Sequence, residues 1–368
     1  MRRLVLAAAL GMAAFGATPA LAQQKVVNVF NWSDYIDETV LEDFTKETGI
    51  KVRYDVFDSN EVLETKLLAG KTGYDVVVPT GSFLQRQIKA GVFQKLDKSK
   101  LTNLQYAWPE ITKRLSVYDP GNDYAVNYMW GTTGIGYNVD MVKQRLGDMP
   151  MNTWDIVFKP ENLSKLKDCG VYFLDGPEEV IPSALRYLGL DPDSKNPDDI
   201  AKAGALLMTV RPYIRKFDSS GYINALARGD ICIAVGWSGD IFQAKTRAAE
   251  AAKKTKKKPV LVEYAIPKEG ALMWFDNFAI PKDAKNVDEA LTFINYMMRP
   301  EVAAKNSNYI SYANGNLASQ KFIDKAIIDN PSIYPNAETM ALLFTVTTYP
   351  QDVQRVVTRT WTAFKRGK

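Results

Sequence analysis

Histidine is absent from this chain of 368 residues. Without an imidazole the chain cannot form a Ser-His-Asp triad, a Cys-His pair or an HExxH zinc site, so these enzyme classes are excluded. A large charge of one sign is absent too, because 46 basic and 42 acidic side chains leave a net charge of +4. We therefore expect no nucleic acid partner. The remaining chemistry belongs to carboxylates, hydroxyls, aromatic rings and the backbone.

Long apolar runs are also scarce, and the one near the start has the features of a secretory signal. Arg2 and Arg3 precede an apolar stretch over 4–18, and Ala20-Leu21-Ala22 forms a small-residue cleavage site before Gln23. The alternative is a membrane anchor, which needs about 20 continuous apolar residues, more than this interrupted run supplies. We predict a signal peptide over 1–22, cleaved after Ala22, and a mature protein free in the periplasm.

Only two cysteines are present, Cys169 and Cys232. An even number of cysteines in an oxidising compartment favours a disulfide between them. The alternative is a pair of buried thiols that pack as small apolar side chains. Two cysteines without a histidine give almost no support to a zinc site, so we expect no metal.

The residues that are present predict a folded α/β protein. A chain of this length with 46% hydrophobic and 24% charged residues is too long for one comfortable core, so two domains are expected. Apolar β-branched runs alternate with helical spacings, which is typical of a parallel sheet covered by helices. The expected strands are 26–30, 51–57, 74–78, 124–128, 135–137, 171–174, 231–235, 261–266 and 275–280. The clearest expected helices are 60–68, 82–90, 178–188, 287–298 and 353–365.

A glycine-rich run at 131–136 separates two of these expected strands. Its spacing matches neither the dinucleotide-binding fingerprint nor a phosphate-binding loop, and it lacks the Lys-Ser/Thr ending of the latter. We therefore assign it a structural role and expect the second domain to begin near residue 131.

Polar and aromatic residues gather in the predicted loops where strands lead into helices or end. In open parallel sheets, ligands bind at these carboxyl ends of the strands. The residues concerned are Trp32, Ser33, Asp34, Tyr35, Thr80, Ser82, Glu179, Trp237, Asp240, Trp274 and Asp276. Helix capping offers another explanation for Ser33, Asp34, Asp240 and the pair Ser82 and Gln85. Capping does not explain why three tryptophans each lie within three residues of a carboxylate.

A cleft lined by indole rings and carboxylates suits an organic cation. Ring faces attract ammonium groups and cover methylenes, while carboxylates accept charge-assisted hydrogen bonds from the nitrogens. A sugar-binding cleft is one alternative, because carbohydrates also stack on aromatic rings. A secreted carbohydrate hydrolase that uses paired acids such as Glu179 and Asp240 is another.

At these positions the chain resembles the bacterial periplasmic polyamine-binding proteins, the solute receptors of ABC importers, and in particular the putrescine-binding type. The resemblance covers essentially all of the expected mature chain. Its most specific pieces are NWSDY at 31–35, YDVVVP at 74–79, AGVF at 90–93, MWGTTGIGYN at 129–138, PEEV at 177–180, GDIC at 229–232 and IPKEG at 266–270.

The resemblance implies a two-lobed periplasmic binding fold of type II, with the ligand in the cleft between the lobes. It implies an N-terminal lobe of 23–130 and 267–312 and a C-terminal lobe of 131–266 and 313–368. The implied protein is a monomer without cofactor or catalysis, which delivers a polyamine to an inner-membrane ABC permease. It also implies a disulfide between Cys169 and Cys232.

Carried over residue by residue, the resemblance gives each site residue a role. An aromatic box is formed by Trp32, Trp237, Trp274 and Tyr312. One ammonium is held by Ser33 and Asp240, and the other by Asp276 with Glu179 nearby. The floor is formed by Asp34, Thr80 and Ser82.

Two positions depart from the family pattern, because Trp274 replaces a phenylalanine and Thr80-Gly81-Ser82 replaces Ser-Ala-Ser. Ser33, Asp34 and Ser82 match the putrescine type, so we expect putrescine to be preferred over spermidine. The alternative is a receptor that prefers spermidine.

Overall fold

The computed structural model describes residues 24–368, in which ten strands form one twisted sheet. The predicted signal peptide over 1–22 and its cleavage site lie outside these residues. The strand order is β2-β1-β3-β9-β4-β7-β5-β6, and β8 and β10 also pair with β4. The strands are β1 Val26–Trp32, β2 Lys51–Phe57, β3 Val76–Val77, β4 Ala125–Asn138, β5 Val171–Phe173, β6 Lys216–Phe217, β7 Ile233–Trp237, β8 Val262–Ala265, β9 Leu272–Ala279 and β10 Ala313–Asn314.

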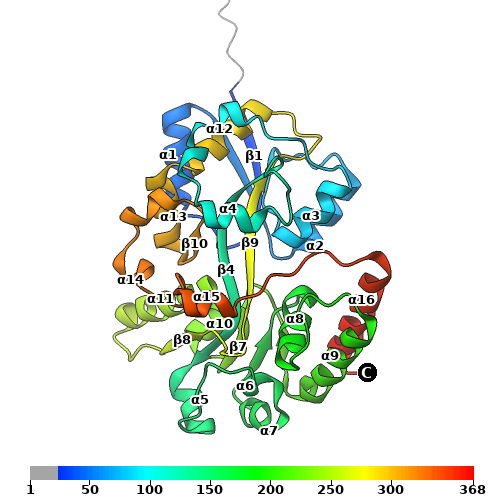
Figure 1. Ribbon diagram of the computed structural model, residues 1–368. Helices are drawn as coiled ribbons and strands as arrows, with labels where there is room; N and C mark the ends of the chain where they lie inside the picture. Colours follow the sequence, from blue (N-terminus) through cyan, green and yellow to red (C-terminus); the bar gives the residue numbers. More distant parts are fainter. Residues whose placement is uncertain (1–23) are drawn as a thin grey trace, which may run out of the picture.

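Helices cover both halves of this sheet (Figure 1). Those before β7 are α1 Glu38–Thr48, α2 Asn60–Ala69, α3 Gly81–Lys89, α4 Pro109–Leu115, α5 Val139–Leu146, α6 Asp155–Phe158, α7 Pro160–Leu163, α8 Pro177–Tyr187, α9 Pro197–Val210 and α10 Tyr222–Arg228. Those after it are α11 Ser238–Thr255, α12 Val287–Met297, α13 Pro300–Ile310, α14 Lys325–Ile328, α15 Ala337–Leu342 and α16 Gln351–Arg366.

The sheet is parallel at its two ends and antiparallel in its centre. The first lobe contains β1 paired in parallel with β2 and β3, and the second lobe contains β5 paired in parallel with β6 and β7. Between them, β4 runs antiparallel to β9, β7 and β8. The prediction of a parallel sheet is therefore wrong for the centre. The physical reason is that β4 carries the chain out of the first lobe and β9 brings it back, so the two strands run in opposite directions (Figure 1).

The two strands expected on either side of the glycine run are one strand, β4, which spans both lobes. Val126 and Met129 pack in the core of the first lobe, and Ile135 packs in that of the second. The glycines permit close packing rather than a turn. A Cβ added to Gly134 would lie 2.5 Å from the Tyr264 hydroxyl, and one added to Gly136 would lie 2.2 Å from Ile241.

The helices that follow the polar and aromatic loops named above do not begin at the residues expected to cap them. Asp37 caps α1, where its carboxylate accepts from the Thr39 N–H. Ser82 lies inside the first turn of α3, and Asp240 is the third residue of α11. The capping explanation for Ser33, Asp34, Ser82 and Asp240 is therefore wrong.

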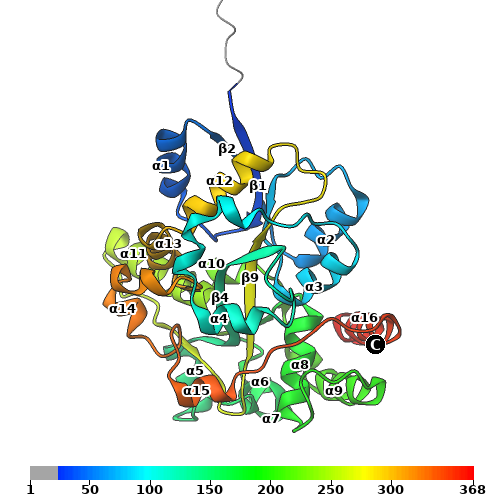
Figure 2. The same ribbon diagram turned by 45° about the horizontal axis from the view of Figure 1, so that its top comes forward.

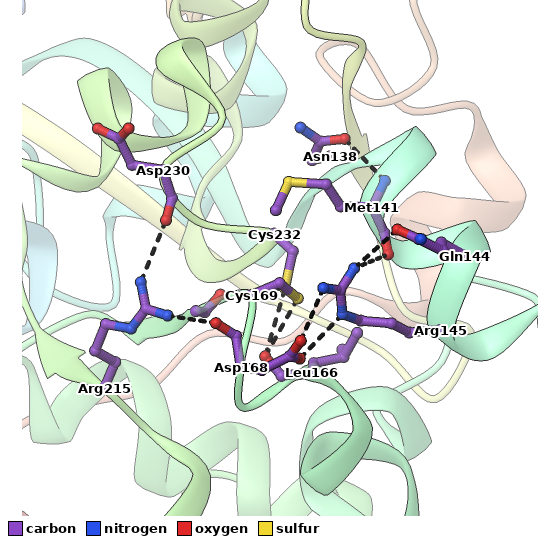
Figure 3. Close-up of a disulfide and its surroundings, with 11 residues drawn as sticks. Asn138, Met141, Gln144, Arg145, Leu166, Asp168, Cys169, Arg215, Asp230 and Cys232 are labelled. Carbon is purple, nitrogen blue, oxygen red and sulfur yellow. Dashed lines mark hydrogen bonds and ion pairs between the residues drawn. A yellow bond between two sulfur atoms is a disulfide. The ribbon is translucent and has the colours of Figure 1, made fainter.

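The C-terminal helix and a disulfide consolidate the second lobe. In Figures 1 and 2 the segment before α16 crosses the face of the molecule, and α16 packs against α9 through apolar residues that include Val357 and Trp361. Cys169 and Cys232 form the predicted disulfide, with their Cα atoms 5.5 Å apart (Figure 3). Beside it, Arg145 donates to the Asp168 carboxylate at 2.9 and 3.0 Å. No helix within residues 24–368 is long and apolar enough to cross a bilayer.

Candidate ligand-binding site

A cavity lies where the β1–α1 and β3–α3 loops of the first lobe face α8 and the β7–α11 junction of the second. It brings together ten of the twelve predicted site residues. These are Trp32, Ser33, Tyr35, Thr80, Glu179, Trp237, Asp240, Trp274, Asp276 and Tyr312. Asn60 and Ser219 complete its wall. No lysine or arginine of the described residues lines this cavity.

The aromatic residues form a connected wall across the two lobes. The ring of Trp237 lies 5.6 Å from that of Trp32 and 6.5 Å from that of Trp274, both edge to face. Tyr312 continues the wall, with its ring 5.4 Å from Trp274 and 5.1 Å from Tyr35. Such rings offer apolar faces to methylenes and negative faces to ammonium groups.

Asp240 is held in place by two phenols. Its carboxylate accepts from the hydroxyls of Tyr312 at 2.6 Å and Tyr222 at 2.7 Å, and its backbone N–H donates to Tyr312 Oη at 3.1 Å. Only 6% of the residue is exposed. Burial raises the pKa of Asp240 to about 7, because a charged carboxylate loses its hydration in the cavity.

Asp276 is held in the same way from the first lobe. Its carboxylate accepts from the hydroxyls of Thr80 at 2.6 Å and Tyr35 at 2.8 Å. Asn60 fixes Thr80 in turn, since its amide donates to the threonine hydroxyl at 3.0 Å and accepts from the threonine N–H at 3.1 Å. Burial raises the pKa of Asp276 to about 7.

Glu179 is a third buried carboxyl group in the same cavity. It accepts a hydrogen bond from the Thr133 hydroxyl. Burial raises the pKa of Glu179 to about 7, which the hydrogen bonds from Thr133 and Trp237 partly offset. Three carboxyl groups thus share one cavity without a cationic side chain, an arrangement that a bound organic cation would neutralise.

Comparison with known proteins identifies the family. The family described as bacterial extracellular solute-binding protein matches residues 39–335. The chain belongs to this family of bacterial solute-binding proteins. It is 56% identical over 348 residues to the putrescine-binding periplasmic protein SpuD of Pseudomonas aeruginosa, covering 94% of each chain. It is 54% identical to the putrescine-binding periplasmic protein PotF of Escherichia coli, over 94% of this chain and 93% of that protein.

The solved structures agree with this assignment. A putative spermidine/putrescine ABC transporter protein from Listeria monocytogenes superimposes with a TM-score of 0.81 at 33% identity, over 94% of this chain and 100% of that chain. The predicted α/β fold with two lobes and the family resemblance are therefore confirmed. SpuD and PotF are both named as putrescine-binding periplasmic proteins.

Two predicted residues of this solute-binding protein lie outside the cavity. The Asp34 carboxylate points to Arg247 of α11, whose guanidinium donates to it at 2.5 Å. Ser82 lines a small side pocket that it shares with Glu179 and Trp274. Neither residue forms the floor of the cavity.

Three residues important to the solute-binding site were missed from the sequence. Asn60 follows β2 at the same edge of the sheet, so its position after a strand could have revealed it. Ser219 follows β6, a strand of two residues that left no clear pattern. Tyr222 supports Asp240 from α10, and no local signal distinguishes it from a core tyrosine.

Within residues 24–368, no three histidine, cysteine, aspartate or glutamate side chains are placed so that they could hold a metal ion together. The carboxyl groups of Asp240, Asp276 and Glu179 accept hydrogen bonds from hydroxyl groups of the protein. These hydrogen bonds orient the carboxyl groups as acceptors for an N–H donor.

Proposed function

We propose that this protein is a periplasmic receptor that binds putrescine between its lobes and delivers it to an ABC importer. The observation that carries the proposal is the cavity of buried Asp240, Asp276 and Glu179, walled by aromatic rings and without a lysine or arginine among the described residues. The names of the 54% and 56% identical relatives support it, since both are putrescine-binding periplasmic proteins.

The proposed pose follows from the positions of the acids. Asp240 of the second lobe binds one ammonium group together with Ser33. Asp276 of the first lobe binds the other ammonium group, and Glu179 lies near it. The methylenes lie between the rings of Trp237, Trp274 and Tyr312. Because one end of the ligand is held by each lobe, binding stabilises the closed arrangement.

Putrescine is proposed over spermidine because the three carboxyl groups that line the cavity are all assigned to the two ammonium groups of the proposed pose. Asp34 would be the nearest additional acceptor, and its carboxylate is engaged by Arg247. Trp274 fills space that a phenylalanine would leave open, and only 6% of it is exposed. A third ammonium held inside the cavity itself would lack a carboxylate of its own, which costs binding free energy.

The proposal includes the cellular setting and the division of the chain. The lobes are proposed as 23–130 with 267–312 and 131–266 with 313–368, supported by the separate cores around β1 and β5. The mature protein is proposed to be a monomer in the periplasm, with an inner-membrane permease as its partner. It binds its ligand without catalysis and without a cofactor.

Titration calorimetry with putrescine, cadaverine, agmatine and spermidine tests this function. We expect putrescine to bind with one site per chain and more tightly than spermidine. Mass spectrometry of the ligand after incubation is expected to recover it intact. Spermidine binding as tightly as putrescine would contradict the preference, and a chemically altered ligand would contradict the assignment as a receptor.

A further inference from the structure

A second groove lies outside the ligand cavity, between α2 and α3 of the first lobe and α8 and α16 of the second. These helices lie on the same side of the molecule in Figures 1 and 2. Ser219 lines both the cavity and this outer groove, so the two are adjacent. The residues that matter below all line the groove: Glu61, Glu64, Arg86, Glu178 and Tyr349.

The outer groove carries more negative than positive charge where the lobes meet. The Arg86 guanidinium bonds to both oxygens of Glu64 at 2.5 Å each, and its other nitrogen lies 4.0 Å from Glu178. Glu61 is near enough to raise the pKa of Glu178, which burial raises most. Glu61 and Glu64 of the first lobe and Glu178 of the second thus lie near a single guanidinium. Among these three, that guanidinium forms hydrogen bonds with Glu64 alone.

Tyr349 is an independent sign that the outer groove takes a ligand. The residue is 8% exposed, and its hydroxyl has no hydrogen-bond partner within residues 24–368. Tyr349 and Glu178 both line the groove. Burial raises the pKa of Tyr349, and the charge of Glu178 raises this pKa further. A buried phenol oxygen without a partner is costly, and a donor bound beside Glu178 would remove that cost.

A short path joins this region to the ligand cavity. Glu178 and Glu179 both line the small side pocket, and Glu179 also lines the cavity. Glu179 thus lies at the proposed position of one ammonium, and the adjacent Glu178 lies in the outer groove.

We propose that the outer groove is a second ammonium site, in which Glu178 accepts a charge-assisted hydrogen bond and Tyr349 a further one. The proposal rests on the proposed function of the inner cavity. The ammonium can come from the third nitrogen of a triamine whose diamine part occupies the cavity, or from a second free amine. Neutralisation by the cation would relieve the repulsion between Glu61 and Glu178 when the lobes close.

Calorimetric titrations of putrescine and spermidine with the wild-type protein, Glu178→Gln and Tyr349→Phe test the outer site. Glu161→Gln is the matched control, because it removes the same charge from an exposed position of α7 in the same lobe. If the third nitrogen of a triamine occupies the site, spermidine affinity falls about tenfold in Glu178→Gln and about threefold in Tyr349→Phe. Putrescine affinity then stays within about twofold of the wild type.

If a second free amine occupies the site, wild-type protein shows a second, weaker putrescine site that both variants lose. Either result supports the outer site and identifies the source of the ammonium. Unchanged binding of both amines in both variants would overturn it, as would equal loss of both amines. Failure of the inner site is distinguishable, because the wild-type protein would then bind neither amine.

Discussion

Asp34 and Arg247 are 213 residues apart in the chain and form an ion pair of 2.5 Å between the β1–α1 loop and α11. Gln243 of the same helix donates to the Asp34 carbonyl at 3.1 Å. Asp34 adopts a left-handed backbone conformation, with φ of 54°, and its side chain contacts α11. The residue expected to touch the ligand instead connects the two lobes beside the candidate cavity.

Arg247→Gln should therefore weaken ligand binding without removing a ligand contact. The ion pair is partly exposed, so we expect a loss of at most about fivefold in affinity, mainly through faster dissociation. Stopped-flow kinetics and calorimetry measure both quantities. Lys245→Gln is the control, since it removes a charge from the same helix that pairs with Glu263 instead. An Asp34→Asn variant that loses affinity far more than Arg247→Gln would show that Asp34 contacts the ligand after all.

The buried acids predict how pH affects closure without ligand. The pKa values of Asp240, Asp276 and Glu179 are raised to about 7 in this closed cavity. Groups with a raised pKa favour the closed form when protonated, and this contribution is lost as pH rises through about 7. Small-angle scattering of ligand-free protein should show a smaller radius of gyration below about pH 6 than at about pH 8.

At the higher pH, putrescine should restore the compact form, because the ligand supplies the missing positive charge. A radius of gyration that changes with neither pH nor saturating ligand would contradict closure of the lobes around the cavity.

Trp274→Phe should shift the preference toward spermidine. The indole N–H of Trp274 has no hydrogen-bond partner within residues 24–368, so its removal leaves no acceptor unsatisfied. The smaller ring gives space to a longer amine, and we expect the affinity ratio of spermidine to putrescine to rise about tenfold. Calorimetry with both amines checks this. A fall in that ratio would show that Trp274 does not limit the cavity.

The secreted protein should begin at Gln23 and contain no alkylatable thiol. Intact mass spectrometry before and after treatment with an alkylating agent measures both features. Reduction of the Cys169–Cys232 bond, whose cysteines are 63 residues apart, should lower the free energy of unfolding by about 4 kcal/mol in the chain-entropy model. A mature start displaced by more than a few residues, or two reactive thiols, would refute the corresponding part.

The spacing of apolar residues along the sequence predicted those helices and strands well whose positions depend on that spacing alone. The expected strand at 51–57 is β2, Lys51–Phe57, and the expected helix at 287–298 is α12, Val287–Met297. The glycine run in β4 was misread as a break, because its glycines accommodate Tyr264 and Ile241 from distant parts of the chain. Close approach of this kind leaves no local signal.

The site was predictable as a set of segments but not as a set of side-chain directions. The prediction that Trp274 and Asp276 lie in a loop is wrong, because both lie inside β9. Asp34 and Asp276 both belong to segments that reach the cavity, yet only Asp276 lines it. The difference lies in a partner, Arg247, and in a positive φ that the sequence does not reveal. Tyr222 was missed for a similar reason, since its role is to hold Asp240 rather than to face the ligand.

Putrescine titration of Asp240→Asn and Asp276→Asn is the most direct test of a dication held between the two lobes. Each variant removes one charge-assisted hydrogen bond and leaves a buried ammonium poorly paired. We predict that each loses roughly 2–5 kcal/mol of binding free energy, which is about 30-fold or more in affinity. Thermal melting of the same variants shows whether they remain folded. Unchanged putrescine affinity in both folded variants would contradict the account.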